Sequence, residues 1–174
     1  MTIRTRTRRP AAARSARRLG AAGGALLLAV GLAGCGGGYP ADIDGTLERV
    51  RGHELVVGVA EDLPHLEVAD DGGISGEEAE ILAGYAEHLG AELVVTQGSE
   101  TDIVAMLDRG EIDIAAGGFP DDTAWSSDAA VTRPYGKGVD GEGKEEKLVF
   151  LLKLGENAFL GDFERYLRDA GHEA

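Results

Sequence analysis

The sequence contains one cysteine, one tryptophan and few aromatic side chains overall, and it lacks the short motifs of many enzyme families. Because Cys35 is the only cysteine, an intramolecular disulfide is excluded. The most apolar segment, residues 19–34, is too short and too rich in glycine for a membrane span, which needs roughly 20 apolar residues. There is no G-x-S-x-G nucleophile motif, no phosphate-binding loop, and no dinucleotide fingerprint set between a strand and a helix. The motifs therefore predict neither catalysis nor a cofactor.

Residues 1–34 have the pattern of an export signal. They contain seven arginines and no acidic residue, and the arginines are followed by an apolar segment. The segment ends in Leu32-Ala33-Gly34-Cys35, which resembles a bacterial lipobox, so Cys35 is the predicted lipidation site. We therefore expect 1–34 to be a lipoprotein signal peptide and the mature protein to be held by palmitate-type acyl chains at the extracytoplasmic face of a bacterial cell membrane. An ordinary thiol is the alternative for Cys35, and the sequence leaves Sec or twin-arginine export open.

Beyond residue 34, the chain is strongly acidic. Ten basic residues remain against all 31 acidic ones, which gives a formal charge of −21. Such a surface repels nucleic acid and anionic lipid headgroups, so nucleic acid is excluded as a partner. It would attract cations or a basic partner, although a merely solvated acidic surface is the simpler interpretation. The remaining 140 residues suit one domain with a single core.

Apolar residues beyond position 52 alternate between strand-like and helix-like spacing. The near-continuous apolar run 55–60 is typical of a parallel strand buried on both faces. The spacing within 77–89 is typical of a helix, which Gly90 ends. A β-α-β-α-β order follows, which predicts an α/β fold with a parallel sheet. The other predicted elements are a strand at 92–96, a helix from Thr101 to Gly110, strands at 112–116, 131–135 and 147–154, and a last helix between Asn157 and Gly171, with Ser75 and Asn157 as caps.

Three predicted loops follow the carboxyl ends of the parallel strands, where ligands bind on open sheets of this kind. They cover residues 60–66, 97–100 and 117–125. Their acidic residues could hold a cation, but loop acids more often form caps and turns. The four histidines lack metal-ligand spacing, so we predict no metal site.

One stretch carries the strongest resemblance to a known family. Leu107 to Gly118 runs from a helix end through a turn glycine and a short strand to a diglycine, and it resembles the "L..G.vDi..gg" signature of bacterial extracellular solute-binding proteins, family 3. The resemblance implies one lobe of a periplasmic-binding-protein-like type II fold, with a mostly parallel sheet flanked by helices, and non-enzymatic solute binding. Other counterparts in the family's order are Leu55–Val59 for "lrvGv", Asp62–Pro64 for "D.pP", Glu77–Leu82 for "fd.dla" and Gly117–Tyr135 for "GG.T.T.eR....FS.PY".

Members of this family have two lobes, and the resemblance covers only the first. In the family, the chain leaves lobe 1 after the "PY" motif, builds lobe 2, and returns through a final strand and helix. Here the return segment begins at Lys147, so only residues 136–146 lie between. These span at most about 36 Å, which is too short for a domain. We therefore expect a lipidated tether and linker at 35–52, a single lobe at 53–174, and an exposed linker at 136–146 in place of lobe 2.

The resemblance also suggests which residues line a ligand site. Family members hold an amino-acid carboxylate with a threonine and an arginine, and these positions are Asp122 and Trp125 here. The aromatic that stacks on ligands falls at Leu66. Because a neutral side chain cannot imitate the bidentate pairing of arginine, the usual carboxylate grip is not expected. The predicted ligand-binding residues are Asp62, Leu66, Gly118, Phe119, Asp122, Thr123 and Trp125, of which Leu66, Phe119 and Trp125 would form an exposed apolar face.

These observations favour a lipid-anchored solute-binding protein, a transport-associated substrate-binding component that recognises a small solute weakly or with a partner. A lone lobe offers one wall, whereas ligand pockets usually enclose most of the ligand. The alternative is a non-enzymatic accessory or sensory module that docks on a membrane transporter or channel, or on a second copy of itself. An enzyme on this scaffold, such as a dehydratase, is the third hypothesis.

Overall fold

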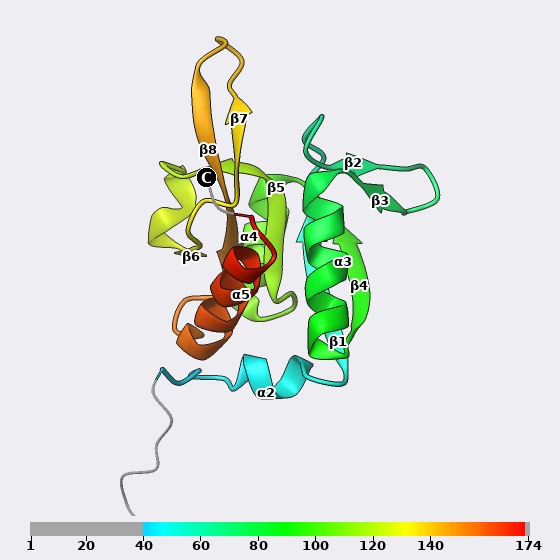
Figure 1. Ribbon diagram of the computed structural model, residues 1–174, viewed down its shortest axis with the longest axis vertical. Coiled ribbons are helices and arrows are strands. Elements are labelled where there is room, and N and C mark those ends of the chain that lie inside the picture. The colour runs from blue at the N-terminus through cyan, green and yellow to red at the C-terminus, as the bar shows by residue number, and fades with distance from the viewer. Residues whose placement is uncertain (1–39, 173–174) are drawn as a thin grey trace, which may run out of the picture. The chain divides into compact units, whose positions relative to one another are not determined.

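The computed structural model describes residues 40–172, and all structural statements below concern this part of the chain. It contains one main β-sheet with helices packed on both faces (Figure 1). None of the helices between residues 40 and 172 is long and apolar enough to cross a membrane. In chain order, the elements are α2 (Thr46–Val50), β1 (Glu54–Val59), β2 (Glu67–Val68), β3 (Ile74–Ser75), α3 (Glu77–Leu89), β4 (Glu92–Gln97), α4 (Glu100–Arg109), β5 (Ile114–Pro120), the 3-10 helix η2 (Ala124–Ser127), β6 (Ala130–Val131), β7 (Gly136–Val139), β8 (Glu145–Leu152) and α5 (Asn157–Asp169).

The main sheet has the strand order β4-β1-β5-β8-β6, and β7 also pairs with β8. β1 is parallel to both β4 and β5, as the β-α-β-α-β pattern predicts. The returning strand β8 is antiparallel to β5, β6 and β7. The predicted α/β class, with a central parallel sheet flanked by helices, is confirmed.

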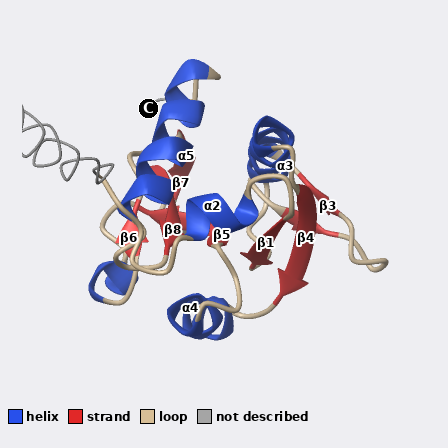
Figure 2. Cartoon of the chain, turned by 90° about the horizontal axis from the view of Figure 1, so that it is seen from below, coloured by secondary structure: helices blue, strands red, loops and turns tan. Residues whose placement is uncertain are grey.

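The central strands are buried on both faces because they are apolar at nearly every position. In β1, Leu55 and Val57 belong to one core cluster, whereas Val56 packs against the other. α3 and α5 cover the first face through residues such as Tyr85 and Phe163. α4 covers the second face, and Figure 2 shows it on the opposite side of the sheet from α3 and α5.

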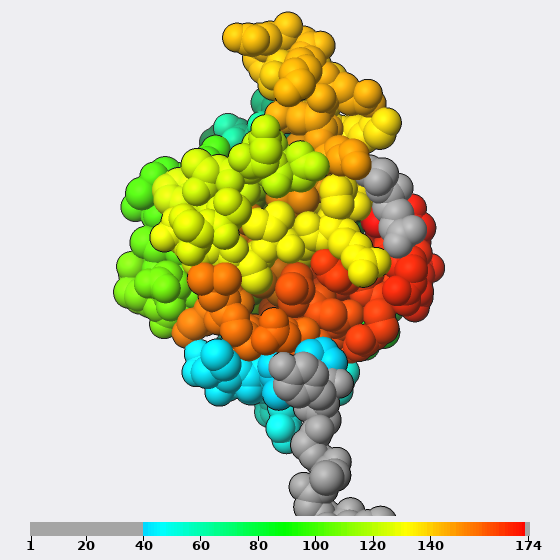
Figure 3. All heavy atoms as spheres, turned by 90° about the vertical axis from the view of Figure 1, so that its left-hand side faces the viewer, coloured from blue at the N-terminus to red at the C-terminus, as the bar shows by residue number. Residues whose placement is uncertain are grey.

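The predicted linker at 136–146 is instead a β-hairpin. β7 pairs antiparallel with β8 from Gly136 opposite Leu148 to Val139 opposite Glu145. Asp140 closes the turn, because its Oδ1 accepts hydrogen bonds from the backbone N–H groups of Glu142 (2.9 Å) and Lys144 (2.8 Å). The sequence of this segment predicted an exposed linker. Hydrogen bonds between strands, however, join backbone groups and need no apolar side chain. The hairpin projects from one end of the sheet (Figures 1 and 3).

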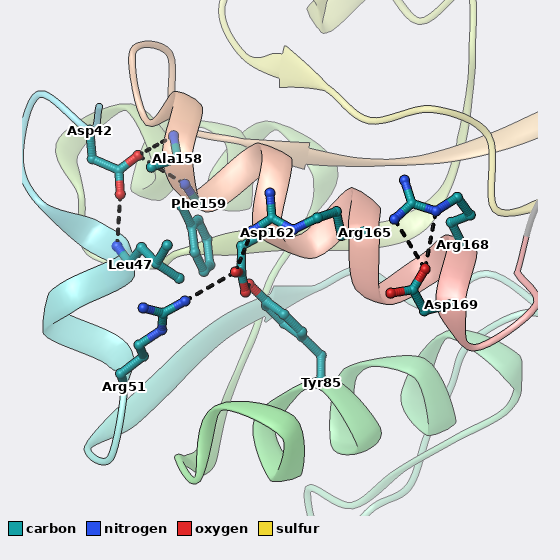
Figure 4. A network of polar contacts seen from close by, with 10 residues as sticks. All are labelled: Asp42, Leu47, Arg51, Tyr85, Ala158, Phe159, Asp162, Arg165, Arg168 and Asp169. Atoms are coloured by element: carbon teal, nitrogen blue, oxygen red, sulfur yellow. Dashed lines mark hydrogen bonds and ion pairs between the residues drawn. The ribbon is translucent and has the colours of Figure 1, made fainter. Parts of the chain in front are cut away.

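The segment before β1 is part of the lobe, so the predicted linker at 35–52 is wrong from Asp42 onward. The Asp42 carboxylate accepts hydrogen bonds from the backbone N–H groups of Ala158 (2.7 Å) and Phe159 (2.9 Å) at the start of α5 (Figure 4). In return, the carboxylate of Glu156, which immediately precedes α5, accepts a hydrogen bond at 3.0 Å from the N–H of Thr46, the first residue of α2. The two helices therefore cap each other, which satisfies N–H groups that have no partner within their own helix.

A buried carboxylate on α5, Asp162, ties this helix to two other elements. It is 5% exposed and pairs with the guanidinium groups of Arg51 (3.1 Å) and Arg165 (2.7 Å). The Tyr85 hydroxyl on α3 donates to it at 3.3 Å (Figure 4). These partners offset the free-energy cost of burying the charge and connect α3, α5 and the loop after α2.

Two predicted helix caps differ from the structure. The Ser75 hydroxyl donates to Glu67 at 3.3 Å, and α3 begins after Gly76 without a side-chain cap. Asn157 is the first residue of α5, and its amide donates to the Gly155 carbonyl at 3.3 Å. The cap of α5 comes from Asp42, which is too distant in sequence for a local pattern to identify. The strand predicted at 131–135 is also shorter, being confined to Ala130–Val131.

We predict that Asp42→Ala lowers the free energy of unfolding by about 1–2 kcal/mol. Asp42 caps α5, and its Oδ2 also accepts from the Leu47 N–H in the first turn of α2 at 2.9 Å. Asn157→Ala is the matched control and should change the free energy of unfolding by only a few tenths of a kcal/mol, because Asn157 caps neither helix. Urea unfolding followed by circular dichroism measures both. An equal loss in the two variants would contradict the capping role of Asp42.

Candidate functional site

Three loops meet at the carboxyl ends of β1, β4 and β5. Residues 60–66 follow β1, residues 98–99 join β4 to α4, and the turn before η2 follows β5. Backbone hydrogen bonds link them, since the Ala60 N–H donates to Ala116 at 2.9 Å and the Gly98 N–H donates to Val59 at 3.1 Å. The parallel register thus places all three loops at one edge of the sheet.

Gly117 and Gly118 let the loop after β1 lie directly against β5. Gly118 has a φ of +63°, a conformation that favours glycine. A Cβ at position 117 would lie 2.9 Å from the Ala60 carbonyl oxygen, and one at position 118 would collide with the carboxylate of Asp62. The register between β5 and β8 also shifts across the diglycine, which is typical of a β-bulge. The two glycines therefore set the position of Asp62.

Glu78 is the most unusual polar residue of this edge. It is fully buried in the first turn of α3, and its Oε1 accepts hydrogen bonds from the Gly118 N–H (3.2 Å) and the Tyr135 hydroxyl (2.6 Å). Within residues 40–172, its Oε2 has no hydrogen-bond partner. Burial raises the pKa of Glu78 to about 7; the two hydrogen bonds oppose this shift, and the negative charges of Asp62 and Glu77 add to it. Near neutral pH this carboxyl can hold or release a proton.

Two further carboxylates and the only tryptophan accompany Glu78. Burial raises the pKa of Asp62; His65 opposes this shift, and the nearby negative charge of Glu100 adds to it. The indole Nε1 of Trp125 donates to Glu100 Oε2 at 3.3 Å. Trp125 is half-buried and packs against the core cluster that contains Ala60. The edge therefore combines acidic groups with an aromatic ring, which suits a cationic group.

The predicted exposed apolar face of Leu66, Phe119 and Trp125 is wrong for two of its three members. Leu66 is fully buried in the cluster beneath α3, and Phe119, at 1% exposure, lies in the cluster beneath α4. Alternation along β5 directs Phe119 into the core, and the short loop after β1 folds Leu66 inward. Neither side chain can contact a solute at the surface.

Thr123 and Asp122 also have other surroundings than expected. Thr123 is buried, and its Oγ1 accepts from the Trp125 backbone N–H at 3.4 Å, so it caps η2. Asp122 is exposed and lines a hollow of about 370 Å³ beside the β7–β8 hairpin, together with residues such as Lys137 and Lys147. Of the predicted set, Asp62, Gly118 and Trp125 lie at the edge built around Glu78.

Glu78, Glu100 and Tyr135 were not among the predicted site residues. The sequence could have indicated the burial of Glu78. This residue lies three residues before Ile81 and four before Leu82, so it shares the apolar face of its helix. A charged residue on such a face is rarely buried without a reason. No local signal identifies Glu100, which is an ordinary acidic residue in the first turn of α4. Between residues 40 and 172, no three acidic, histidine or cysteine side chains are grouped to hold a metal ion.

Comparison with known families identifies the fold. The profile of bacterial extracellular solute-binding proteins, family 3, matches residues 55–147, which is more than half of the chain. The chain belongs to this family. A search of the curated proteins found no significant match.

Solved structures of solute-binding family members have a similar fold. Domain 1 of the arginine-binding protein of T. maritima, in its arginine-bound form, is 24% identical with a TM-score of 0.60, over 70% of this chain and 95% of that one. An ancestral cationic amino acid solute-binding protein is 13% identical (TM-score 0.60, 72% of this chain and 92% of that one). A lysine-bound protein from Wolinella succinogenes is 15% identical (TM-score 0.59, 68% and 90%). The predicted one-lobe fold of solute-binding family 3 is confirmed.

The elevated pKa of Glu78 predicts an unusual dependence of stability on pH. Because the folded-state pKa lies above the ordinary value of 4.5, this group's stabilising contribution is full below pH 4.5 and is lost as pH rises through about 7. The loss should be about 3 kcal/mol. Glu78→Gln should remove this part of the decline. Glu77→Gln, at an exposed neighbour whose charge adds least to the raised pKa of Glu78, should retain most of it. Urea unfolding at pH 5 and pH 8 measures the difference, and identical pH profiles for wild type and Glu78→Gln would refute it.

Proposed function

We propose that this protein is a non-enzymatic, lipid-anchored, extracytoplasmic member of solute-binding family 3 whose single lobe binds a small cationic solute in association with transport. The observation that carries the proposal is the proximity of Asp62 to two further acidic groups at the carboxyl edge of the sheet, Glu78 and Glu100. Glu100 in turn accepts a hydrogen bond from the Trp125 indole. Family membership supports the binding role, and the residues at this edge suggest the chemistry of the solute.

The acidic charge of this edge supports a positively charged solute. Glu78 is fully buried and contacts no solute directly, but when it is ionised its charge adds to that of the half-buried Asp62. An ammonium or guanidinium group supplies both the charge and the donors. The half-buried indole of Trp125 adds an aromatic ring to which a cation is attracted. Relatives bound to arginine and to lysine are in line with this choice.

The same edge supports a solute without a carboxylate. The family's carboxylate-binding arginine is replaced by Trp125. The nearby Arg133 is directed elsewhere, since it is exposed and pairs with Glu164 of α5 at 3.6 Å. A carboxylate placed beside Asp62 and Glu78 would be repelled. We therefore expect amines and guanidines to bind better than the corresponding amino acids.

We predict that agmatine, the decarboxylated form of arginine, quenches or shifts Trp125 fluorescence saturably, with a dissociation constant of about 1 mM because only one wall encloses it. L-arginine should bind more weakly, and L-citrulline, which lacks the positive charge, should not bind. Asp62→Asn should weaken agmatine binding by about tenfold, the loss of one charge-assisted contact.

Asp122→Asn is the matched control for this titration, because Asp122 is an exposed acidic residue of the loop after β5 that lines the hairpin hollow. It should leave agmatine binding unchanged. Equal binding of agmatine and citrulline, or equal effects of the two substitutions, would contradict a cationic site at Asp62.

The lipid anchor has its own test. We predict that the protein from membranes carries a diacylglyceryl-type lipid on Cys35, which mass spectrometry of the N-terminal peptide detects. Cys35→Ser should release the protein from the membrane fraction, because the substitution removes the site of the acyl chains that hold it there. Retention of Cys35→Ser in washed membranes, with no added lipid mass on the wild type, would overturn the anchor.

A second candidate, an accessory module that docks on a membrane transporter, is favoured by two exposed apolar residues near the same edge. Leu63 in the loop after β1 and Val139 in the hairpin are each 66% exposed. They replace the buried Leu66 and Phe119 as candidate contacts. If Leu63→Ser and Val139→Ser abolish co-purification with a transporter while agmatine does not bind at all, docking is the better account.

A further inference from the structure

The exposed large hydrophobic side chains of the described residues fall at two ends of the lobe. Leu63 and Val139 lie towards the candidate site and the hairpin, whereas Ile43 (79% exposed) and Leu154 (52% exposed) lie at the other end. Ile43 and Leu154 are neighbours, because the Ile43 N–H donates to the carbonyl of Gly155 at 3.3 Å and a Cβ at position 155 would collide with the Ile43 side chain. We call these two residues the apolar pair.

The apolar pair lies at the amino ends of the parallel strands. Ile43 precedes α2, which leads directly into β1, and Leu154 follows β8, which runs antiparallel to β5. Figures 1 and 3 show α2 and the segment after β8 together at one end and the β7–β8 hairpin at the other. The candidate site occupies the carboxyl ends of the same strands, so the pair and the site are at opposite ends of β1.

Ile43 of the apolar pair is close to Cys35 along the chain. Asp42, whose carboxylate fixes the chain to α5, is only seven residues after Cys35. Seven residues span at most about 25 Å. A lipid on Cys35 therefore holds this end of the lobe close to the bilayer whatever the conformation of the intervening residues.

The surroundings of the pair are electrically balanced, unlike the rest of the chain. A hollow of about 190 Å³ beside it is lined by three basic and three acidic side chains, whereas acids outnumber bases about threefold from residue 35 onward. A balanced surface is repelled less by anionic headgroups than an acidic one. The charged residues of the hollow are Arg49, Arg109, Lys153, Asp44, Asp113 and Glu156.

We propose that Ile43 and Leu154 rest on the surface of the bilayer that carries the anchor and thereby point the candidate site away from the membrane. The inference rests on the lipid anchor of the proposed function. A bilayer is a better partner for the apolar pair than a second copy of the protein, because two chains of charge −21 repel each other. Two side chains also bury far less than the area of about 800 Å² per partner that a protein interface needs. Insertion into the headgroup region needs only such a small apolar contact when a lipid supplies the anchor.

Quenching by brominated lipid tests the orientation. Leu154→Trp and Val139→Trp are each made in a Trp125→Phe background, and the protein from membranes is reconstituted into vesicles that contain brominated phosphatidylcholine. If the purified protein carries no lipid on Cys35, the anchor proposal itself is wrong. Cys35, which is the only thiol of the chain, is then coupled to a maleimide lipid, so that the orientation is tested in either case. The substituted side chains other than the half-buried Trp125 are exposed, and thermal melting verifies that the variants fold.

We expect the brominated lipid to reduce the emission of the Leu154→Trp protein by about half, and that of the Val139→Trp protein by less than about a tenth, as for a probe at the bilayer surface and one held away from it. Adding Ile43→Glu to the Leu154→Trp protein should at least halve the quenching, and adding Val139→Glu, the matched control, should not alter it. Equal quenching of the Leu154→Trp and Val139→Trp proteins overturns the orientation. Quenching of the Leu154→Trp protein that is insensitive to Ile43→Glu overturns the contact, because the tether alone would then explain it.

Discussion

The close approach of Gly118 to Asp62 is the constraint on which the candidate site depends. No side chain larger than hydrogen fits at position 118, so the loop after β1 can lie against β5 only with this glycine. The same residue presents its N–H to Glu78 at 3.2 Å, which joins α3 to that edge. Three elements therefore converge on one backbone position. The buried carboxyl of Glu78 and the half-buried Asp62 are brought together there. Burial raises the pKa of both groups, and the negative charge of Asp62 raises the pKa of Glu78 further.

The β7–β8 hairpin lies where the family resemblance predicts the connection to a second lobe. The chain crosses from β7 to β8 through a turn closed by Asp140 and then re-enters the sheet. A solute at the carboxyl edge contacts one wall, and binding energy must come from charge rather than enclosure. This is why the account favours a cation, for which the acids around Trp125 offer strong contacts over a small area.

Much of the fold could be predicted from the sequence because its signals are local. Continuous apolar strands, amphipathic helices and turn glycines predicted the order β1, α3, β4, α4 and β5, and the diglycine indicated the site edge. The short strands β2 and β3 were not predicted. Contacts between distant residues were not accessible: the mutual caps of Asp42 and Glu156, and the partners of Glu78, come from segments far apart in sequence. Leu66 and Phe119 were misjudged because family position, not burial, suggested them. The hairpin at 136–146 was not predicted, because its glycines are typical of a linker and the pairing of β7 with β8 uses backbone groups.

The central claim is that the carboxyl edge binds a cation within a single lobe, and mapping of amide chemical shifts by NMR tests it most directly. On addition of agmatine, the Gly118 amide and the Trp125 indole N–H should move saturably, together with amides of the loop after β1, because these groups border Asp62 and Glu78. Resonances of the hairpin and of α2 should stay in place. Shifts confined to the hollow beside Lys137 or to the end near Arg49, or no saturable shift at the Gly118 amide, would contradict the account.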